Sequence, residues 1–347
     1  CVREEHDTNL VLIEFAEIRF QYCTNCSSRI SIRFQINISN IYAAFANHPS
    51  FVDIKLVEGD IQNSRELFCG RGIIYEPQFG NARRIISIVN ALVTTIDDIY
   101  DIYGTLEELE IFTAMVDNWD VNRLDELPEY MRLCSYFVQR SQQHWMRHSQ
   151  INILNVIPFL KKSWADLCKT YLVEAKWYKK GYKPTVKEYI QNAWISISGQ
   201  TILIHFYIAI LETLAQHRQD IVRCSATILR LANDLATSPD ELARGDVLKS
   251  VQCYMHETGA TEEEAQAHVQ QMICDTWEEM NYEAKMAGTS SLPRGFVEAA
   301  MNVARMAQCI YQYGDGHGCP EEGKTVERFM YLVVNPVTNT KVISLLS

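Results

Sequence analysis

The sequence has few of the residues that break a chain into several domains. It holds nine prolines and 15 glycines among 347 residues, with no internal repeat, low-complexity run or Gly/Ser-rich linker. These absences argue against separate domains joined by linkers. The length and the 47% hydrophobic content allow one large core. We therefore predict a single domain over residues 1–347.

Recognisable targeting and membrane signals are also lacking. The most apolar stretch, 195–210, is interrupted by Ser196, Gln200 and His205, which favours a buried core helix over a membrane span. The first ten residues, CVREEHDTNL, are acidic and unlike a transit peptide. We expect from this that the chain begins at an incomplete start.

Positive charge and paired cysteines are both scarce. The chain has 32 Lys and Arg against 43 Asp and Glu, a net charge of −11, which argues against nucleic acid as a partner. Of 11 cysteines only Cys23 and Cys26 are separated by two residues, and no second pair completes a zinc site. We interpret the cysteines as reduced thiols of an intracellular compartment.

From about residue 72 onward the sequence predicts an all-α fold. Apolar periodicity indicates helices over 81–104, 105–120, 185–198, 261–287 and 294–314. Gly104 is a stop signal, and both Thr105 with Glu108 and Thr185 with Glu188 form capping-box patterns. Two stretches differ from this pattern. In 30–39 apolar and polar residues alternate, as in a β-strand, and 135–150 has no stripe of apolar residues at helical spacing.

Three aspartates interrupt the apolar helix expected at 81–104. Unpaired buried charges are costly, so a positive partner is expected for Asp97, Asp98 and Asp101. At about 100° per residue, Asp101 lies about 40° from Asp97, and Asn90 about 20°. This oxygen-rich stripe suits a hard cation such as Mg²⁺. A solvated acidic helix face is the alternative.

A second cluster combines oxygen ligands with cations. On one helix Thr237 lies about 40° from Asn233 and Glu241 about 80°, so an amide, a hydroxyl and a carboxylate share a side. Arg230 and Lys249 would supply positive charge for an anion.

The second cluster also has a purely structural interpretation. Ser238 followed by Pro239 is a good helix start, with Glu241 at the capping-box position. A break at Pro239 would turn Glu241 away from Asn233 and Thr237, and the ion site would then be lost.

The two clusters together resemble the metal motifs of class I terpene synthases. The stretches GIIYEPQFGNARR, VNALVTTIDDIYDIYGTLEELE, NVIPFLKKSWADLCKTYLVEAKWY, LRLANDLATSPDELARGDVLKSVQCYMHETGA and YQYGDGHG are similar to plant monoterpene synthases of the mint-family type. The likeness covers roughly 72–134 and 151–330. It implies an all-α barrel of antiparallel helices around a central apolar pocket, a prenyl diphosphate substrate, and three divalent cations, Mg²⁺ or Mn²⁺.

The resemblance assigns roles residue by residue. It implies metal ligands at Asp97, Asp101, Asn233, Thr237 and Glu241, support of the site by Asp98, and diphosphate binding by Arg230 and Lys249. Tyr311 and residues 314–318 would belong to a loop that caps the pocket. A helix break near Ser198–Gly199 would line the cavity.

The reaction would create an allylic cation that must be kept from water. Aromatic faces stabilise such cations, and Trp194, Phe206, Tyr207 and Tyr311 are candidates. Ordinary core packing is the alternative for these four. Asn90, about 10.5 Å from Asp97 along the helix, would hold a water beside the cyclised cation. A hydrogen bond to neighbouring backbone is the alternative for its amide.

The chain departs from the family pattern at several places. Where the family has an Arg-x-Arg pair, this chain has Asp60-Ile61-Gln62. Where the family has a tryptophan in the pocket, this chain has Cys69. About eight residues are expected to be missing between Tyr207 and Leu211. We interpret these places, with 30–39 and 135–150, as segments read in a wrong frame or mis-spliced. We expect a divergent part at 1–71, a helical core at 72–330, a tail at 331–347 and no family N-terminal domain.

The resemblance implies a metal-dependent cyclase of geranyl diphosphate whose preferred product is cineole. Sabinene- or limonene-type products, a farnesyl diphosphate cyclase and a catalytically inactive helical protein are the alternatives. It further implies a plastid protein, as a monomer or homodimer, with no nucleic-acid or membrane partner.

Overall fold

The computed structural model describes most of the chain after residue 69. The described residues are 70, 72–119, 121–132, 134–135, 156–210, 219–244, 248–287 and 292–314, without the side chains of 84, 121, 122, 124, 219 and 239–244. The expected strand at 30–39, the departures at 60–62 and 69, and residues 136–150 of the stretch without a helical stripe lie outside these residues. The deletion expected between Tyr207 and Leu211 falls where the described part of α9 ends, at Ile210.

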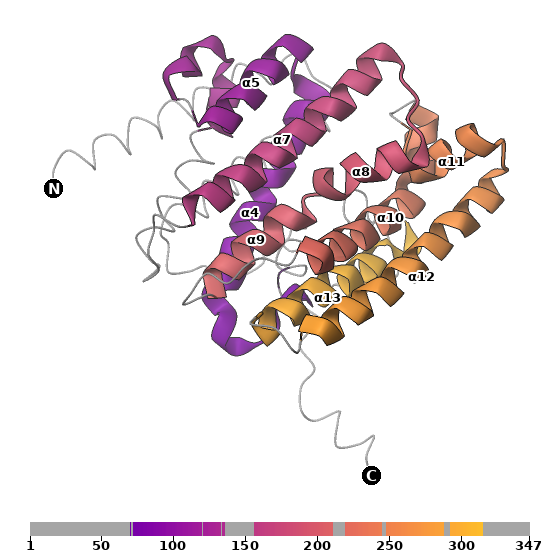
Figure 1. Cartoon of the computed structure of the whole chain (residues 1–347). Coiled ribbons are helices and arrows are strands. Elements are labelled where there is room, and N and C mark those ends of the chain that lie inside the picture. The colour runs from indigo at the N-terminus through magenta and orange to yellow at the C-terminus, as the bar shows by residue number, and fades with distance from the viewer. Residues whose placement is uncertain are drawn as a thin grey trace, which may run out of the picture. The chain divides into compact units, whose positions relative to one another are not determined.

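All regular secondary structure in the described residues is helical, so the predicted all-α fold is confirmed. The long helices are α4 (Gly80–Asp98), α5 (Leu106–Asn118), α7 (Ile157–Lys180), α8 (Val186–Ser196), α9 (Gly199–Ile210), α10 (Gln219–Arg244), α11 (Ser250–Thr258), α12 (Glu262–Ala287) and α13 (Arg294–Ile310). Short 3-10 segments are η3 (Pro77–Phe79), η5 (Val121–Glu126) and η7 (Tyr311–Tyr313), and η4 (Ile99–Tyr103) is a π-helical turn. Figure 1 shows α8 and α9 lying between α7 and α10.

Helix α10 occupies the centre of the packing. It packs against α8, α9, α11, α12 and α13, while α4 packs against α9 and α5 against α7. The apolar faces of these helices close the core, where Trp164, Phe112 and Phe296 are fully buried. Each such side chain contributes roughly 1.5–3 kcal/mol to folding.

The two predicted capping boxes start α5 and α8. The Thr105 side chain accepts from the Glu108 amide while Glu108 accepts from the Thr105 amide, and Thr185 and Glu188 repeat the exchange. Each pair satisfies two amide donors that a helix start leaves open. Local sequence therefore determined where these helices begin.

The predicted break near Ser198–Gly199 is confirmed. Helix α8 ends at Ser196, Ser198 has a left-handed backbone with φ 67°, and α9 begins at Gly199. A Cβ atom on Gly199 would lie 3.2 Å from the Cβ of Ala226, so the glycine lets α9 approach α10 closely.

The alternative helix start at Ser238 is wrong, because α10 runs unbroken through Pro239 to Arg244. A proline inside a helix leaves an upstream carbonyl without its amide partner. Next to it, Gln252 Nε2 donates to the Ser238 hydroxyl at 2.6 Å and to its carbonyl at 3.3 Å. Contacts from α11 thus support the helix where local sequence favours a new start.

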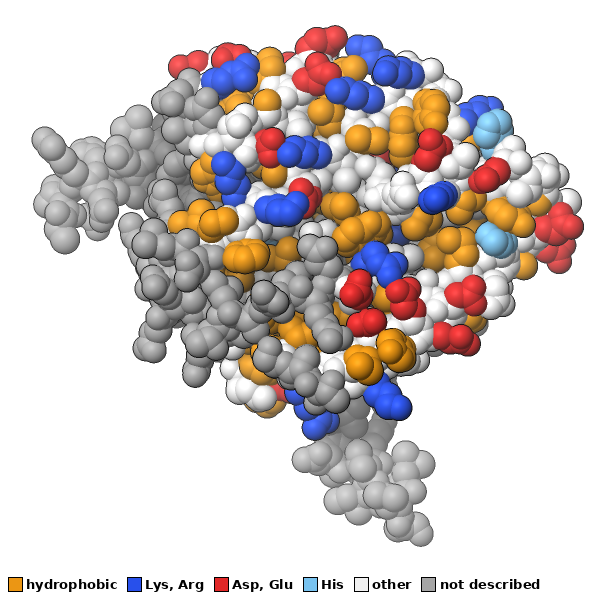
Figure 2. Space-filling view, viewed as in Figure 1, with side chains coloured by type: hydrophobic (Ala, Val, Ile, Leu, Met, Phe, Trp, Pro, Cys, Tyr) orange, Lys and Arg blue, Asp and Glu red, His pale blue; other side chains and the backbone are white. Residues whose placement is uncertain are grey.

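Three exposed ion pairs join α5 to α7. They are Lys169–Asp117, Lys176–Glu110 and Lys179–Glu107, at 2.6, 2.8 and 3.3 Å. Figure 2 shows Lys and Arg side chains interspersed with Asp and Glu side chains over this part of the face. Each exposed pair contributes about 0.2–1 kcal/mol, so burial between the helices dominates their packing.

Among the described helices, only Val186–Ile210 is long and apolar enough to cross a membrane by length and composition. Within the fold, 72% of its most apolar window is buried. The same burial is found in core helices of soluble proteins, and the stretch is broken at Ser198.

Candidate metal and diphosphate site

The aspartates lie where α4 gives way to the π-helical turn η4. Asp97 and Asp98 are the last residues of α4, and Asp101 is in η4. The turn is closed by a hydrogen bond from the Gly104 amide to the Ile99 carbonyl at 2.8 Å. Such wide turns are rare and concentrate at functional sites.

Apolar packing holds the other side of this turn. Ile99 is fully buried, and the Tyr100 ring contacts those of Phe112 and Tyr171. The Tyr100 hydroxyl also lies 2.6 Å from the Thr113 hydroxyl. With that side anchored in the core, Asp101 is left exposed at the surface of the turn.

The carboxyl groups of Asp97 and Asp101 both have raised pKa values. Burial, then the charge of Asp98, raises the pKa of Asp97 to about 6, while Lys249 and Arg230 oppose the rise. Partial removal from water by the surrounding protein, followed by the charge of Asp97, raises the pKa of Asp101 to about 7, and the charges of Lys249 and Arg230 oppose this rise. The Asp101 residue nevertheless keeps an exposed surface. Removal from water is thus the main cause of both raised pKa values, and the neighbouring carboxylates add to it.

The second cluster lies on α10 as the helical spacing predicted. Arg230 is 6% exposed, and its Nη1 donates to Asn233 Oδ1 at 3.3 Å. The Thr237 hydroxyl donates to the Asn233 carbonyl at 3.0 Å. The Glu241 side chain lies outside the described residues, although its backbone belongs to α10.

The two clusters interact electrostatically. The charges of Arg230 on α10 and Lys249 at the start of α11 act on both Asp97 and Asp101. The sequence separates these cations from the aspartates by more than 125 residues, and the packing of α10 and α11 brings them together. Positive charges that act on the aspartates, as the sequence led us to expect, are therefore present.

Sequence reasoning missed Glu174, a buried carboxylate on α7. Its side chain accepts hydrogen bonds from Asn192 Nδ2 at 2.9 Å and from the Ser196 hydroxyl at 2.6 Å. Its charge also raises the pKa of Asp97 and Asp101, so it belongs to the same cluster. The sequence could have pointed to Glu174, because it shares a helix face with Leu167 and Tyr171, which are both buried.

The donor chemistry fits a hard divalent cation. The candidate ligands are two carboxylates on α4 and η4 and an amide and a hydroxyl on α10, and all four offer oxygen. Within the described side chains, no three His, Cys, Asp or Glu groups form a metal cluster by themselves. Metal binding here would use the two aspartates with Asn233 and Thr237, and a bound cation would favour the ionised form of both carboxyl groups.

Asn90 lies on α4 about 10.5 Å from Asp97 by helix rise. Its carbonyl accepts from the Thr94 hydroxyl at 3.1 Å, while its half-buried amide makes no hydrogen bond to any described residue. The alternative of a bond to nearby backbone therefore finds no support among the described residues. A half-buried amide of this kind offers a partner to a bound water.

Two of the aromatic candidates pack in the core. Phe206 is fully buried and meets the Phe79 ring edge-on at 5.9 Å, and Tyr207 meets the Phe296 ring at 4.8 Å. These contacts support the core interpretation for both. Trp194 is half-buried on α8, and its role stays a prediction.

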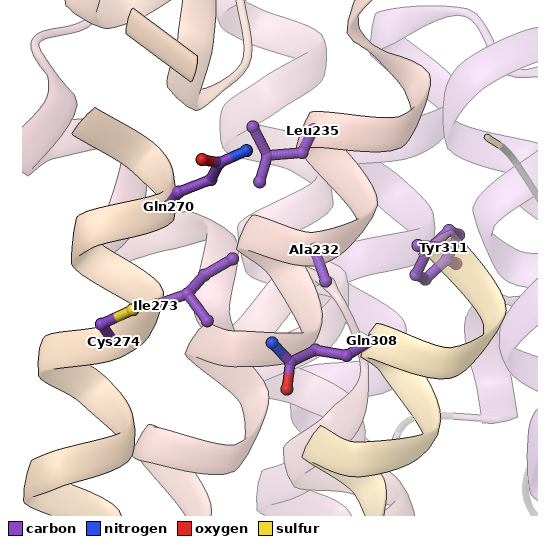
Figure 3. Close-up of a pocket in the computed structure, with 7 residues that line it drawn as sticks. All are labelled: Ala232, Leu235, Gln270, Ile273, Cys274, Gln308 and Tyr311. Atoms are coloured by element: carbon purple, nitrogen blue, oxygen red, sulfur yellow. The ribbon is translucent and has the colours of Figure 1, made fainter. Parts of the chain in front are cut away.

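Tyr311 lines a separate pocket of about 290 Å³ between α10, α12 and α13. Figure 3 shows Gln270, Ile273 and Cys274 on one wall, Ala232 and Leu235 on α10, and Gln308 with Tyr311 across from them. Ala232 and Leu235 lie about 200° and 140° from Arg230 around α10, away from the second cluster. Of 314–318 only Gly314 is described, so the capping role of Tyr311 and this loop stays a prediction.

Comparison with known proteins gives consistent matches. Residues 64–279 match the "Terpene synthase family, metal binding domain". The chain is 60% identical over 349 residues to 1,8-cineole synthase 1, chloroplastic, of Arabidopsis thaliana, covering 96% of this chain and 56% of that protein. It is 59% identical to beta-myrcene/(E)-beta-ocimene synthase 2, chloroplastic, of the same plant, with the same coverage. The chain thus spans about half the length of the curated relatives it matches.

Solved structures agree in fold. Limonene synthase with 2-fluorolinalyl diphosphate superposes with a TM-score of 0.76 at 35% identity, covering 92% of this chain and 62% of that one. Isoprene synthase from grey poplar leaves, in complex with three Mg²⁺ ions and dimethylallyl-S-thiolodiphosphate, superposes with a TM-score of 0.73 at 36% identity. The match covers 89% of this chain and 60% of that one.

Proposed function

Because this chain belongs to the terpene synthase family, we propose that it ionises geranyl diphosphate with divalent cations and cyclises the product to a monoterpene. The observation that carries the proposal is the interaction of two charge clusters. The charges of Arg230 and Lys249, from α10 and α11, lower the pKa of both Asp97 and Asp101, from α4 and η4. Carboxylates and cations that converge in this way suit a metal–diphosphate complex.

The metal ligands of the proposal are Asp97, Asp101, Asn233, Thr237 and Glu241. When bound, divalent cations neutralise the negative charge that develops on the leaving diphosphate. Asp98 supports the two aspartate ligands, and the buried charge of Glu174 adds to the pull on cations. Mg²⁺ is the preferred metal with Mn²⁺ as alternative, and the three Mg²⁺ ions named for the isoprene synthase complex support a count of three.

Arg230 and Lys249 bind diphosphate oxygens in this proposal. A guanidinium forms charge-assisted hydrogen bonds in a fixed plane, while the ammonium of Lys249 acts as a mobile point charge. Tyr311, which lines the pocket between α10, α12 and α13, and residues 314–318 would belong to a loop that closes over the bound substrate and keeps water away from the allylic cation.

Cineole is the product that we propose. The relative named 1,8-cineole synthase is 60% identical, and the Asn90 amide is available to hold the water that cineole formation consumes. The relative named for myrcene and ocimene is 59% identical, so unhydrated hydrocarbons form the second candidate. Both relatives are called chloroplastic, which supports a plastid location. A monomer or homodimer without nucleic-acid or membrane partners completes the proposal.

The experiment incubates the purified chain with geranyl diphosphate and Mg²⁺ and analyses volatile products by gas chromatography. A parallel arm uses farnesyl diphosphate, and a second arm uses the double variant Asp60→Arg, Gln62→Arg, which restores the family's arginine pair. We expect weak turnover of geranyl diphosphate by the parent and faster turnover by the double variant.

Asp97→Asn is the matched control. It should retain the helical circular dichroism and lose turnover, because one carboxylate ligand is replaced by a weaker amide. Folded parent and double variant that both release no terpene would contradict the proposed function.

A further inference from the structure

Asp234 is a fully buried carboxylate at the junction of three helices. Its exposed fraction is 0%, yet it is assigned to neither metal nor substrate. Its Oδ1 accepts from the Tyr189 hydroxyl on α8 at 3.0 Å and from Arg230 Nη1 at 3.5 Å. Its Oδ2 accepts from the Ser250 amide on α11 at 3.2 Å.

The bond to Ser250 fixes the beginning of α11. Ser250 is the first residue of that helix, and its amide is among those that a helix leaves without an internal partner. A carboxylate at this position also interacts favourably with the helix dipole. Lys249 immediately precedes Ser250, so the anchored backbone sets where the lysine side chain starts.

Through its hydrogen bonds to Arg230 and to the Ser250 amide, Asp234 therefore influences the positions of both Arg230 and Lys249. Arg230 is held by Asp234 on one side and by the Ala193 carbonyl and the Ser196 hydroxyl on another, at 3.2 and 3.1 Å. Lys249 directly precedes Ser250, whose backbone amide donates a hydrogen bond to Asp234. Both cations act on Asp97 and Asp101 across the site.

We propose that Asp234 is a positioning residue, which holds Arg230 and the start of α11 so that Arg230 and Lys249 together face the diphosphate. The proposal rests on the proposed function for the identity of the anion. Asp234 itself does not touch the substrate, because its oxygens are taken by Tyr189, Arg230 and Ser250.

A proline at position 250 tests the anchoring bond without altering a charge. Ser250→Pro removes the amide hydrogen that Asp234 accepts, and proline is well tolerated at the first position of a helix. Lys249 has φ −94° and ψ −175°, the extended conformation that a residue before proline favours. Ser250→Ala is the matched control, because it keeps the amide, and the Ser250 hydroxyl has no hydrogen-bond partner among the described residues.

Binding of inorganic pyrophosphate in the presence of Mg²⁺ is measured by calorimetry, together with kcat and KM for geranyl diphosphate. We expect Ser250→Pro to weaken pyrophosphate binding at least tenfold and raise KM, with Ser250→Ala within twofold of the parent. A loss of folded protein alone would lower the number of pyrophosphate-binding sites per chain, and it would leave the Kd for pyrophosphate and the KM for geranyl diphosphate unchanged. Equal pyrophosphate affinities for the proline and alanine variants would overturn the proposal.

Hydrogen exchange of Asp234→Asn tests the same bond without any ligand. The amide side chain is a weaker acceptor for the Ser250 amide, so exchange in the first turn of α11 should quicken at least tenfold relative to α12. Unchanged exchange there overturns the proposal. A parent chain that binds no pyrophosphate and releases no terpene would instead refute the proposed function, while the exchange data still decide whether Asp234 anchors α11.

Discussion

Single polar residues inside apolar surroundings decide much of the chemistry of this protein. Asp97, Glu174 and Asp234 are acids within buried helix faces, and each is surrounded by specific cations or donors. Asn90 differs, because its amide makes no hydrogen bond to any described residue. His205 is a third case, in which a titratable ring is buried and kept neutral.

Asn90 allows a test of product choice. Asn90→Ile removes the proposed partner of a bound water and fills its place with apolar surface, so proton loss from the cyclised cation should exceed water capture. In the active parent, or in the chain with arginine at 60 and 62, gas chromatography should show a shift from oxygenated to hydrocarbon monoterpenes. Unchanged cineole and terpineol fractions would refute the water-holding role.

His205 should make stability depend on pH. Its Nε2 accepts from the Trp164 indole at 3.3 Å, and its Nδ1 lies 2.7 Å from the Thr201 carbonyl, which assigns the proton to Nδ1. Burial lowers its pKa from 6.5 to about 4, against the Thr201 carbonyl, which raises it. Between these values the unfolded chain binds a proton that the folded chain does not, so stability falls as pH falls.

The expected loss approaches about 1.4 kcal/mol per pH unit inside that window. Urea unfolding of the parent and of His205→Gln, from pH 7 to pH 4.5, measures it, because the variant lacks the titrating ring. The parent should lose more stability than the variant as pH falls. Parallel pH curves for the two proteins would show that His205 does not contribute.

At the scale of elements, the π-helical turn η4 sets where Asp101 lies. Its closing bond brings the Gly104 amide to the Ile99 carbonyl, and α5 begins directly afterwards at Leu106. A Cβ atom on Gly104 would lie 2.9 Å from that carbonyl and 2.5 Å from Leu109 Cδ2. The turn therefore depends on the absence of a side chain at residue 104.

Gly104→Ala should destabilise the fold by about 1–3 kcal/mol, because the Ile99 carbonyl is backbone and cannot move aside cheaply. Gly80→Ala is the control, since its Cβ would meet only Arg83 Nη2 at 3.6 Å in a helical position where alanine is favoured. Urea unfolding should therefore show a loss for residue 104 and none for residue 80. Equal stabilities would mean that η4 adapts to the added methyl group.

At the scale of the whole molecule, the proposed site combines three parts that are far apart in the chain: α4 with η4, α7, and α10 with α11. A ligand that bridges these elements should stabilise all of them together. Mg²⁺ with pyrophosphate at 100 times its Kd would add about 2.7 kcal/mol to the free energy of unfolding. We expect a rise of several degrees in Tm by calorimetry.

Asp97→Ala should abolish that rise in Tm. Without ligand this variant should melt at or above the temperature of the parent, because removing one carboxylate relieves repulsion with Asp98 and Asp101. An equal ligand-induced rise in parent and variant would place the Mg²⁺–pyrophosphate complex elsewhere on the molecule.

The sequence by itself determined the features that depend on neighbouring residues. The helical fold and the capping boxes at Thr105 and Thr185 were predicted correctly, because periodicity and caps act within a few residues. The break before Gly199 was implied by the family resemblance and is also present. Both motifs were recognised for the same reason, as spacing along single helices shows which side chains share a face.

Only the tertiary structure decided how those helices meet. The uninterrupted passage of α10 through Pro239, the π turn at Ile99–Tyr103 and the position of Tyr311 in a separate pocket were not predictable from local pattern. Glu174 and Asp234 acquire their partners through hydrogen bonds that span 16 to 45 residues. Such contacts form when distant helices pack, and the energy of that packing overrides the preferences of the local sequence.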